Sequence, residues 1–460
     1  MNNIKKALVC AAAAGAATFA TATPVVSDVT MAQSNSGSRL VRITYKLTED
    51  AVVTLDIQTN ATPNAATGWA SIGGKAICNA QGAVWRKVTS VDADGNGNYT
   101  IKWRPDKSWT DEFGNGFKIA DGCAKAVVTA WSLDNTPNYM VVDISAGAQP
   151  NTQKYYPAED FLPGGLLGNP AYRTSMLVMR KIMAKDVTWT MGSSELEAQQ
   201  VNTGDRDAAR EATHQVTLTN NYYIGVFEVT QGQWALVQAN RPTPSGFTNA
   251  ADRAMRPVEG VCYNEIRMAA NNTSADSGAR EWPEAPFAGS FLDLLHTRTG
   301  IYFDLPSEAQ WEFAARAGNG DTKWGDGSPM SNTPKDPSMD LLGRYERNGG
   351  KVQNGNNYSN PDAGCGVANG TAIVGTYNKN SWGLYDMAGN VWEWCLDKYQ
   401  ENITTLNGVV NTASGSERVV RGGSWAHRAG MCRPAFRNKN SAITRYNYYG
   451  FRVLCTAGLQ

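Results

Sequence analysis

Short runs in which apolar and polar residues alternate, separated by turn-forming residues, dominate positions 38–148. A period of two places every second side chain on the same face of a strand, so this alternation predicts half-buried strands rather than helices. The runs that show it are Arg39–Leu47, Ala51–Ile57, Tyr99–Trp103, Ala124–Trp131 and Tyr139–Ile144. Several short strands between turns are typical of two packed antiparallel sheets. The sequence therefore predicts a β-sandwich domain at 38–148.

The chain from residue 149 onward has a different pattern. Residues 149–172 contain several Pro and Gly and are expected to form a linker. Beyond them, Thr230–Gln233 and Ser307–Gln310 each place a hydroxyl residue three positions before a Gln, which is the capping box of a helix start. The second box is expected to open a helix over Glu308–Ala317. Because the 45 Gly and 14 Trp also favour turns and ring-lined surfaces, we predict an α+β domain at 173–460.

Charge and the N-terminus limit the partners and the compartment. The 42 Lys and Arg balance the 42 Asp and Glu, so the chain lacks the basic footprint of a nucleic-acid-binding protein. Residues 1–22 combine a basic start, an apolar run and the small residues Ala20-Thr21-Ala22, which is the pattern of a secretory signal peptide. No later stretch is long enough to cross a membrane. We therefore expect an exported protein, secreted, periplasmic or displayed on the cell surface.

The cysteines carry a parity constraint. Removal of the signal peptide with Cys10 leaves seven, namely Cys78, Cys123, Cys262, Cys365, Cys395, Cys432 and Cys455. Outside the cytoplasm most cysteines form disulfides. Cys78 and Cys123 are the only two in the first domain, so we expect them to form a disulfide. Seven is odd, and at least one thiol must therefore stay free, bind a metal or pair between chains.

A series of collinear segments in the second domain points to a known family. They are Trp189-Thr-Met-Gly-Ser, Phe227-Glu-Val-Thr-Gln-Gly-Gln-Trp, Arg256-Pro-Val-Glu-Gly-Val, Phe303-Asp-Leu-Pro-Ser-Glu-Ala-Gln-Trp-Glu-Phe-Ala-Ala-Arg-Ala-Gly, Lys323-Trp-Gly-Asp, Trp382-Gly-Leu-Tyr-Asp-Met-Ala-Gly-Asn-Val-Trp-Glu-Trp, Arg421-Gly-Gly-Ser-Trp and Gly450-Phe-Arg-Val. This series closely resembles the sulfatase-modifying-factor family, whose founding members are the formylglycine-generating enzymes. The resemblance implies a C-type-lectin-like α+β fold with little regular structure. It does not extend to the first 150 residues.

The segment from Asp386 to Glu393 is a candidate calcium site. Ca²⁺ prefers six to eight oxygens that mix carboxylates with backbone carbonyls, and two carboxylates on either side of a Gly-containing turn can supply both ends. The resemblance implies a structural calcium held by Asp386, Gly389, Val391 and Glu393. Alternatively, the two carboxylates only accept hydrogen bonds from the backbone of the turn. Asn348 is a candidate ligand of a second calcium.

The candidate reaction centre follows Arg421-Gly-Gly-Ser424. Family members that generate formylglycine hold copper between two cysteines in this region, because two soft thiolates select Cu(I). Counted from Ser424, the second of these cysteines matches Cys432, whereas the first matches His427. A cysteine and a histidine can still bind copper, although with a different charge and redox behaviour. Ser424 and Trp392 match positions that shape the family's active site.

Two functions therefore stay open. One is a copper- and O₂-dependent oxidoreductase that converts a cysteine of an exported sulfatase to formylglycine, with Cys432 as the redox thiolate and Ser424, His427 and Trp392 along the substrate groove. The other is a non-catalytic, calcium-stabilised module that binds a glycan or protein through the same cleft. The replacement of one cysteine by His427 favours the module. A disulfide between Cys432 and either Cys395 or Cys455 would also exclude the oxidoreductase.

Overall fold

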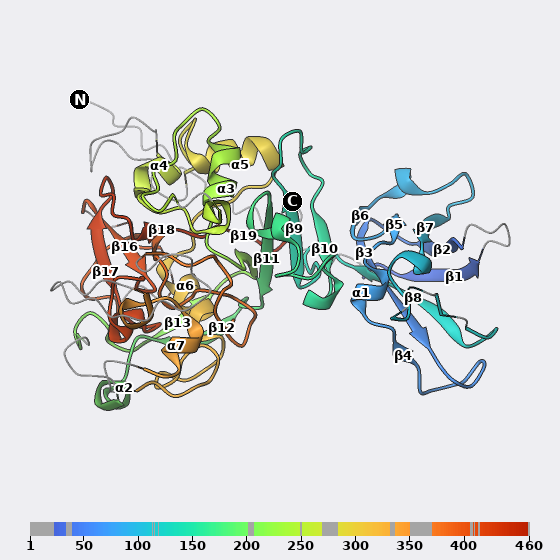
Figure 1. The fold of residues 1–460 in the computed structure, drawn as a ribbon, viewed down its shortest axis with the longest axis horizontal. Helices are drawn as coiled ribbons and strands as arrows, with labels where there is room; N and C mark the ends of the chain where they lie inside the picture. The colour runs from blue at the N-terminus through green and yellow to red at the C-terminus, as the bar shows by residue number, and fades with distance from the viewer. Residues whose placement is uncertain are drawn as a thin grey trace, which may run out of the picture.

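The computed structural model describes residues 23–458 apart from 34–38, 113, 115, 118, 201–206, 249–250, 269–283, 332–335, 350–369, 405–407, 409 and 413–414. The predicted signal peptide at 1–22 and Cys365 lie outside the described residues. The described chain forms two lobes, with the first strands in one and all the helices after α1 (Gly74–Ile77) in the other (Figure 1).

The first lobe contains two four-stranded sheets. One sheet has the order β1-β2-β7-β5, and in the other β3 lies between β4 and β6 and also pairs with β8. Their bounds are β1 Val26–Gln33, β2 Val41–Leu47, β3 Ala51–Thr59, β4 Ala70–Ser71, β5 Gln81–Gly82, β6 Arg86–Val88, β7 Tyr99–Trp103 and β8 Ala124–Trp131. The pairings are antiparallel, with Ile43 opposite Ile101 and Leu55 opposite Val128. These four side chains belong to one buried cluster, which explains the period-two pattern of the sequence.

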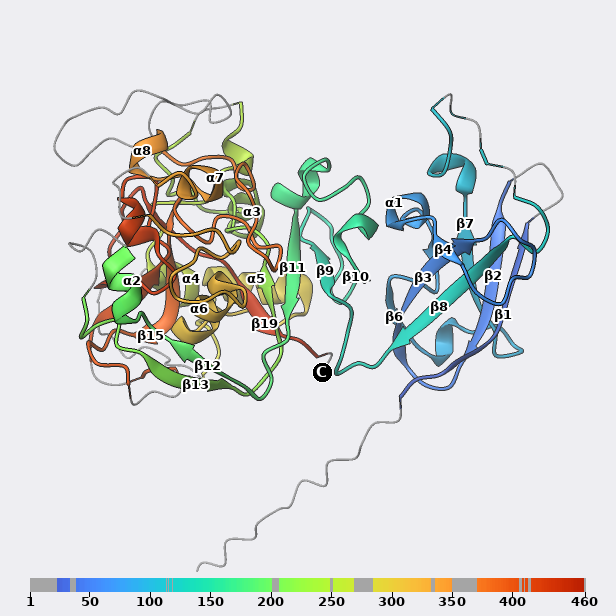
Figure 2. The ribbon, with the colours of Figure 1, turned by 90° about the horizontal axis from the view of Figure 1, so that it is seen from below.

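The second lobe is built on a five-stranded sheet with the order β10-β9-β11-β14-β19. The strands are β9 Tyr139–Asp143, β10 Lys154–Tyr156, β11 Met176–Ile182, β14 Tyr222–Gly225 and β19 Leu454–Thr456. The expected domain boundary at 148 therefore needs correction, because β9 pairs with β11 of the second lobe and Val141 lies opposite Val178. Alternation identifies a strand but does not name its partner. Part of the expected linker at 149–172 likewise forms β10 at the edge of this sheet (Figure 2).

The rest of the second lobe is a hairpin, a four-stranded sheet and short helices. The hairpin is β12 (Val187–Met191) with β13 (His214–Leu218), and the sheet has the order β17 (Asn438–Ser441), β16 (Glu417–Arg421), β15 (Trp392–Lys398), β18 (Tyr449–Gly450). The helices are α2 Glu195–Gln200, α3 Gln231–Val237, α4 Tyr263–Arg267, α5 Phe291–Thr299, α6 Glu308–Arg316, α7 Met339–Leu342 and α8 Glu346–Gly349. Among the described helices, none combines the length and the apolar sequence that a membrane crossing requires. This mixed α+β composition agrees with the prediction.

Both capping boxes form as the sequence predicts. The hydroxyl of Thr230 accepts from the backbone of Gln233 at the start of α3, and Ser307 accepts from Gln310 at the start of α6. The expected helix over Glu308–Ala317 ends one residue earlier, because Ala317 adopts a left-handed conformation as the C-cap.

The two lobes share part of their core. Trp85 of the first lobe packs against Tyr156 and Phe161, with ring centroids 5.3 and 5.9 Å apart, and its carbonyl accepts a hydrogen bond from Tyr155 N at 2.8 Å. The first lobe is therefore seated on the edge of the sheet that carries β10.

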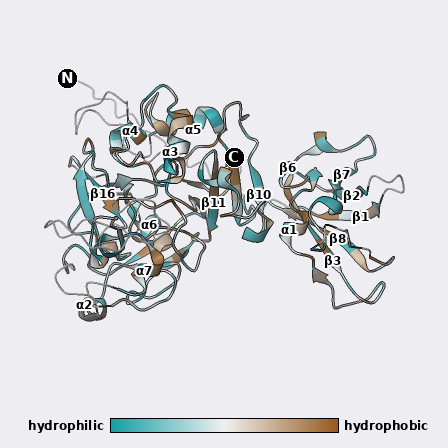
Figure 3. Cartoon of the chain, in the orientation of Figure 1, coloured by the Kyte–Doolittle hydropathy of each residue, from teal (hydrophilic) through white to brown (hydrophobic). Residues whose placement is uncertain are grey.

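In Figure 3, hydrophobic residues gather on strands such as β11, whereas the connecting loops are mostly hydrophilic.

The expected disulfide between Cys78 and Cys123 is absent, and that prediction was wrong. Cys78 caps the end of α1, and its thiol donates to the carbonyl of Lys75 at 3.2 Å. Cys123 precedes β8 and its thiol contacts the carbonyl of Ala61 at 3.8 Å. No disulfide joins any two of the described cysteines. The sequence shows that this lobe contains two cysteines, but it does not show which way their side chains point.

We expect Cys78 and Cys123 both to react with iodoacetamide when the purified protein is denatured without a reductant. The result follows from two thiols that each contact a different backbone carbonyl instead of each other. Peptide mass mapping, with a reduced sample as the reference for complete labelling, measures it. Recovery of a peptide that links the two residues would contradict the described geometry.

Candidate functional site

The segment Arg421–Ser424 leaves β16 and folds back as a tight loop. Gly422 and Gly423 both have positive φ, 93° and 72°. A Cβ at Gly423 would lie 2.4 Å from the Sγ of Cys432, and one at Gly422 would lie 3.0 Å from the ring of Trp311. Only glycine fits such close approaches at these backbone angles. The two glycines therefore bring the loop directly onto Cys432 and α6.

Buried ion pairs hold the elements around this loop. Arg421 is fully buried and pairs with Glu312 and with Glu308 of α6. Arg452 pairs with Glu393 through two contacts of 2.6 Å. Arg433 and Arg437 are paired in the same way, with Glu211 and Glu308 respectively. These four arginines therefore neutralise internal carboxylates.

The structure brings Ser424, His427 and Trp392 together. The Oγ of Ser424 lies 2.6 Å from the Nδ1 of His427, and the indole N–H of Trp392 donates to the same nitrogen at 3.2 Å. Since an indole N–H can only donate, Nδ1 is the acceptor and Nε2 carries the proton of the neutral ring. Burial lowers the pKa of His427 to about 4, and the positive charge of Arg428 acts in the same direction. The imidazole is therefore neutral at physiological pH.

Cys432 lies in a different environment. Its side chain is fully buried in an apolar cluster formed with Trp324, Met330, Met339, Leu342, Tyr345, Ala388 and Ala429. The ring of His427 contacts the rings of Trp392 and Tyr448. Nδ1 of His427 already accepts hydrogen bonds from Ser424 and Trp392. Nδ1 is thus occupied, which leaves Nε2 as the ring nitrogen of His427 that could coordinate a metal ion.

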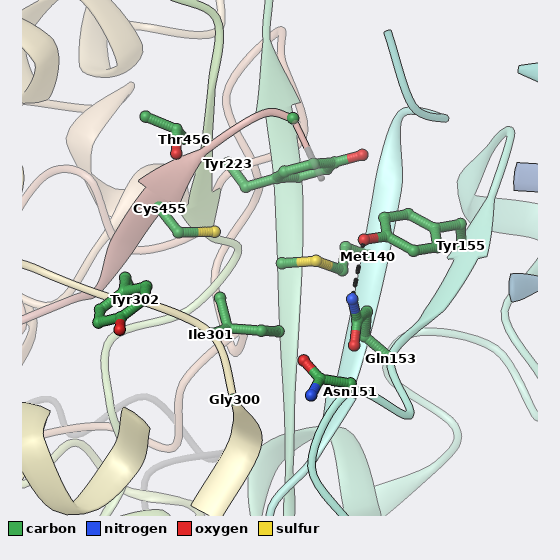
Figure 4. A pocket seen from close by; sticks show the side chains of 11 residues that line it. Met140, Asn151, Gln153, Tyr155, Tyr223, Gly300, Ile301, Tyr302, Cys455 and Thr456 are labelled. Atoms are coloured by element: carbon green, nitrogen blue, oxygen red, sulfur yellow. Dashed lines mark hydrogen bonds between the residues drawn. The ribbon is translucent and has the colours of Figure 1, made fainter. Parts of the chain in front are cut away.

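The alternative disulfides of Cys432 with Cys395 or Cys455 are not formed either, and this expectation is corrected. Cys395 packs in the cluster around Trp311. Cys455 lines a cavity of about 230 Å³ together with Met140 and Tyr223 (Figure 4). The three cysteines are therefore distributed among three separate parts of the core.

The Asp386 turn gathers carboxylates around one arginine. Asp386 accepts from Gly375 N at 2.8 Å through Oδ2, while its buried Oδ1 has no partner in the described structure. Glu393 is engaged by Arg452 and by the indole N–H of Trp311 at 2.8 Å. Glu228, which the sequence reasoning missed, accepts from Val391 N at 3.1 Å. Asp386 and Glu393 alone were expected, so the turn is more acidic than the sequence indicated.

This accumulation of acidic groups shifts their proton affinities. Burial raises the pKa of Asp386 to about 6, with a further rise from the charge of Glu393. Burial also raises the pKa of Glu228 well above its ordinary value, followed by the effects of Asp386 and Glu393. Arg452 supplies one positive charge against the three carboxyl groups. Among the described residues, no group of three or more His, Cys, Asp or Glu side chains is arranged to hold a metal ion, and Arg452 engages both oxygens of Glu393.

Asn348 is committed to its own turn. Its Oδ1 accepts from Tyr345 N at 2.8 Å and its Nδ2 donates to the carbonyl of Gly343 at 2.8 Å. Both amide atoms therefore stabilise the start of α8. The side chain serves the local backbone in this arrangement.

A cavity of about 430 Å³ lies beside the His427 site. It is lined by Arg241, Pro242, Thr243, Pro244, Gly246, Glu259, Gly260, Glu265, Arg445, Tyr446 and Asn447. Tyr446 is 45% exposed and stacks on Tyr448 with ring centroids 5.0 Å apart, and Tyr448 contacts the ring of His427 at 5.1 Å. Sequence reasoning missed this cavity, although the aromatic run at Tyr446–Tyr449 was a visible signal.

The second lobe matches a known family. The profile described as the sulfatase-modifying factor enzyme 1-like domain covers residues 179–457. The chain belongs to this family. The predicted resemblance is thereby confirmed, over nearly the range that the sequence motifs indicated.

Individual relatives of the family match parts of the chain. The formylglycine-generating enzyme of Thermomonospora curvata is 33% identical over 172 residues, which are 35% of this chain and 52% of that protein. The formylglycine-generating enzyme of Streptomyces coelicolor is 32% identical over 34% of this chain and 47% of its own length. The chain thus spans about half the length of these two enzymes. The chaperone protein LppX of Paenibacillus barcinonensis is 28% identical over 256 residues, which are 52% of this chain and 81% of that protein.

Two solved structures align with part of the chain. Treponema denticola variable protein 1 gives a TM-score of 0.43 at 26% identity and covers 61% of this chain and 95% of its own. PvdO from Pseudomonas aeruginosa gives a TM-score of 0.42 at 21% identity, with 61% of this chain and 94% of its own covered.

We expect His427 to remain neutral from pH 8 down to about pH 5. Its pKa in the folded protein is depressed to about 4, whereas an unfolded chain titrates near 6.5. The folded state therefore binds fewer protons between these values, and stability falls as the pH drops from about 6.5 to about 4. NMR of the imidazole Cε1–H, assigned with a His427→Gln variant, measures the titration. A midpoint near 6.5 would contradict the hydrogen bonds from Ser424 and Trp392.

Proposed function

We propose that this member of the family is a non-catalytic binding module. The cavity beside the His427 site carries this proposal, because it is concave and is lined by charged side chains together with the exposed ring of Tyr446. Such a combination of a hollow surface, an aromatic ring and a few polar groups is typical of ligand sites. The site lies in the second lobe, and the first lobe would serve as a docking or spacer domain.

The arrangement of His427 supports a binding role over an oxidative one. Family members that generate formylglycine hold copper between two thiolates, because soft sulfur ligands select Cu(I). Here one thiolate is replaced by an imidazole whose Nδ1 already accepts from Ser424 and Trp392. Cys432 is packed among Trp324, Met339 and Tyr345. These contacts engage both side chains in the packing and hydrogen bonding of the loop, which supports a binding role.

A protein ligand fits this chain better than a glycan. LppX, which matches over 81% of its own length, is named a chaperone, and this name supports a polypeptide partner. An exported sulfatase is one candidate partner, since the family includes formylglycine-generating enzymes. A glycan ligand remains the alternative that a binding screen would detect.

We expect no oxidation of a sulfatase cysteine peptide by this protein with Cu(I) and O₂. The reason is that the paired thiolates of the family are absent. Mass spectrometry of the peptide, with the Thermomonospora curvata enzyme as a positive control, detects the change from thiol to aldehyde. Aldehyde formation by the parent protein and its loss in Cys432→Ser would overturn the proposal in favour of the copper-dependent oxidoreductase.

We further propose that a calcium ion binds at the Asp386 turn. The ligands would be the unpartnered Oδ1 of Asp386 and the carbonyl oxygens of Gly389 and Val391, with the carboxylate of Glu393 shared with Arg452. The ion would neutralise the excess of buried acidic groups and fix the turn that precedes β15. We propose a structural role for this ion.

We expect calcium to raise the unfolding midpoint of the parent protein. A free concentration of about one hundred times Kd corresponds to about 2.7 kcal/mol of stabilisation. Thermal denaturation with calcium and with a chelator measures the difference for each variant. Asp386→Ala should lose the calcium-dependent difference, whereas Asp121→Ala, at an exposed acidic residue of the first lobe, should retain it. Equal calcium effects in both variants would place the ion elsewhere.

We also propose that the protein is exported, that the second lobe has a C-type-lectin-like fold and that the first lobe is a β-sandwich. The basic and apolar N-terminus supports secretion or transport to the periplasm or cell surface. The many short strands and loops of the second lobe support a C-type-lectin-like fold, and the two sheets of the first lobe support a β-sandwich. Determination of the mature N-terminus would test export, since cleavage after Ala22 is the expected result.

A further inference from the structure

A cavity of about 480 Å³ lies at the seam between the two lobes (Figure 2). Cys78, Gln81 and Trp85 of the first lobe line it, together with strands β9 and β10 of the second. Every residue that lines it precedes residue 179, where the family profile begins, and none of them lines the cavity beside the His427 site. Small ligands often bind between domains, in cavities of about 300–1,000 Å³. This seam therefore has the place and the size of a ligand site.

Three buried aromatic rings form much of the cavity wall. They belong to Trp85, Tyr156 and Tyr172, and the rings of Trp85 and Tyr156 lie 5.3 Å apart. Val141 and Met176 add aliphatic surface. These walls favour a ligand with an apolar or aromatic part, because the burial of such surface is favourable.

Trp85 is held in an unfavourable conformation at this wall. Its φ is 61°, in the left-handed region that a bulky residue rarely adopts. Its N–H donates to Val53 O at 2.7 Å and its carbonyl accepts from Tyr155 N at 2.8 Å, so the backbone is fixed on both sides. The indole Nε1 is buried and has no hydrogen-bond partner in the described structure. Strained backbone and unpaired polar atoms gather at functional sites, so Trp85 supports a ligand site here.

Two side chains of opposite charge also line the cavity. Lys154 of β10 lies opposite Val141 of β9, and Asp143 follows two positions later on the same face of the sheet. Such diagonal neighbours lie about 7–8 Å apart in an antiparallel pair. Oδ1 of Asp143 accepts from Ser145 N at 2.8 Å, and neither charged side chain has an ion-pair partner among the described residues. Both charges can therefore interact with a ligand that carries both signs.

We propose that this seam binds a free α-amino acid with an apolar or aromatic side chain. Its ammonium group would contact Asp143 and its carboxylate would contact Lys154, through charge-assisted hydrogen bonds. Its side chain would pack against Trp85, Tyr156 and Tyr172. An α-amino acid carries both charges on groups bonded to one carbon, so a single head group can reach the two side chains. The site is additional to the proposed binding function and does not depend on it.

Calorimetry on the full-length protein tests the chemistry of the ligand. The probes are L-phenylalanine, 3-phenylpropionate, which lacks the ammonium group, 2-phenylethylamine, which lacks the carboxylate, and glycine, which lacks the side chain. We expect L-phenylalanine to bind at least tenfold more tightly than each of the other three. Comparable binding of L-phenylalanine and either singly charged analogue would overturn the proposal, and so would the absence of L-phenylalanine binding.

Neutral replacements of the two charged side chains should each affect one analogue. Lys154→Gln should weaken the binding of L-phenylalanine and 3-phenylpropionate at least fivefold and leave that of 2-phenylethylamine unchanged. Asp143→Asn, which keeps the Oδ1 acceptor for Ser145 N, should show the opposite selectivity. Lys107→Gln, at an exposed lysine of the first lobe outside the cavity, should bind every probe as the parent does. Equal losses for all probes in either cavity variant would contradict the assigned contacts.

Hydrogen exchange tests whether the ligand occupies the seam. Tyr155 N donates to Trp85 O across the two lobes, so a ligand that contacts both lobes should slow exchange at Tyr155 severalfold. L-phenylalanine should lose this effect in Gln81→Trp, because Gln81 is exposed and lines the cavity, and a larger side chain there would obstruct it. If Gln81→Trp failed to fold, Lys154→Gln would replace it as the variant with weaker protection. Unchanged exchange at Tyr155 with L-phenylalanine bound would show that the ligand lies elsewhere and would overturn the proposal.

Discussion

The second lobe depends on buried arginine–glutamate pairs. Arg421 joins β16 to α6 through Glu308 and Glu312, and Arg452 joins the C-terminal segment to β15 through Glu393. All of these side chains are almost fully buried. Removal of one partner of such a pair typically costs about 3–5 kcal/mol, because a charge is left without compensation. In a domain with short strands and few helices, these pairs fix loops that regular secondary structure does not reach.

The same network explains how the loop at Ser424 is placed. Arg421 anchors the end of β16, and Gly422 and Gly423 then turn the chain within contact distance of Trp311 and Cys432. Ser424 is thereby brought to His427, whose Nδ1 also accepts a hydrogen bond from Trp392 at the start of β15. The position of His427 therefore depends on how Arg421 and the residues that follow it are packed. The cavity follows from it in turn, because Tyr448 and Tyr446 stack outward from the His427 ring.

Local features of the chain were predictable from sequence, and long-range ones were not. The strands of the first lobe and the caps at Thr230 and Ser307 follow from patterns within a few residues. Collinear motifs identified the family and predicted that Ser424, His427 and Trp392 lie at one site. The pairing of β9 with β11, the partners of the cysteines and the role of Glu228 depend on contacts between residues that lie far apart in the chain. The cavity combines segments near residues 241, 259 and 445, and no local pattern indicates that they meet.

The fold and the chemistry of this family are separable for a physical reason. The buried ion pairs that stabilise the lobe use Glu308, Glu312 and Glu393 with their arginines, and none of them involves His427 or Cys432. A cysteine at the position of His427 can therefore be exchanged for another residue without disturbing the network. In this chain the replacement is held by Ser424 and Trp392, which satisfies the polar atom of a buried imidazole. The ion pairs that stabilise the lobe therefore place no demand on which residue stands at position 427.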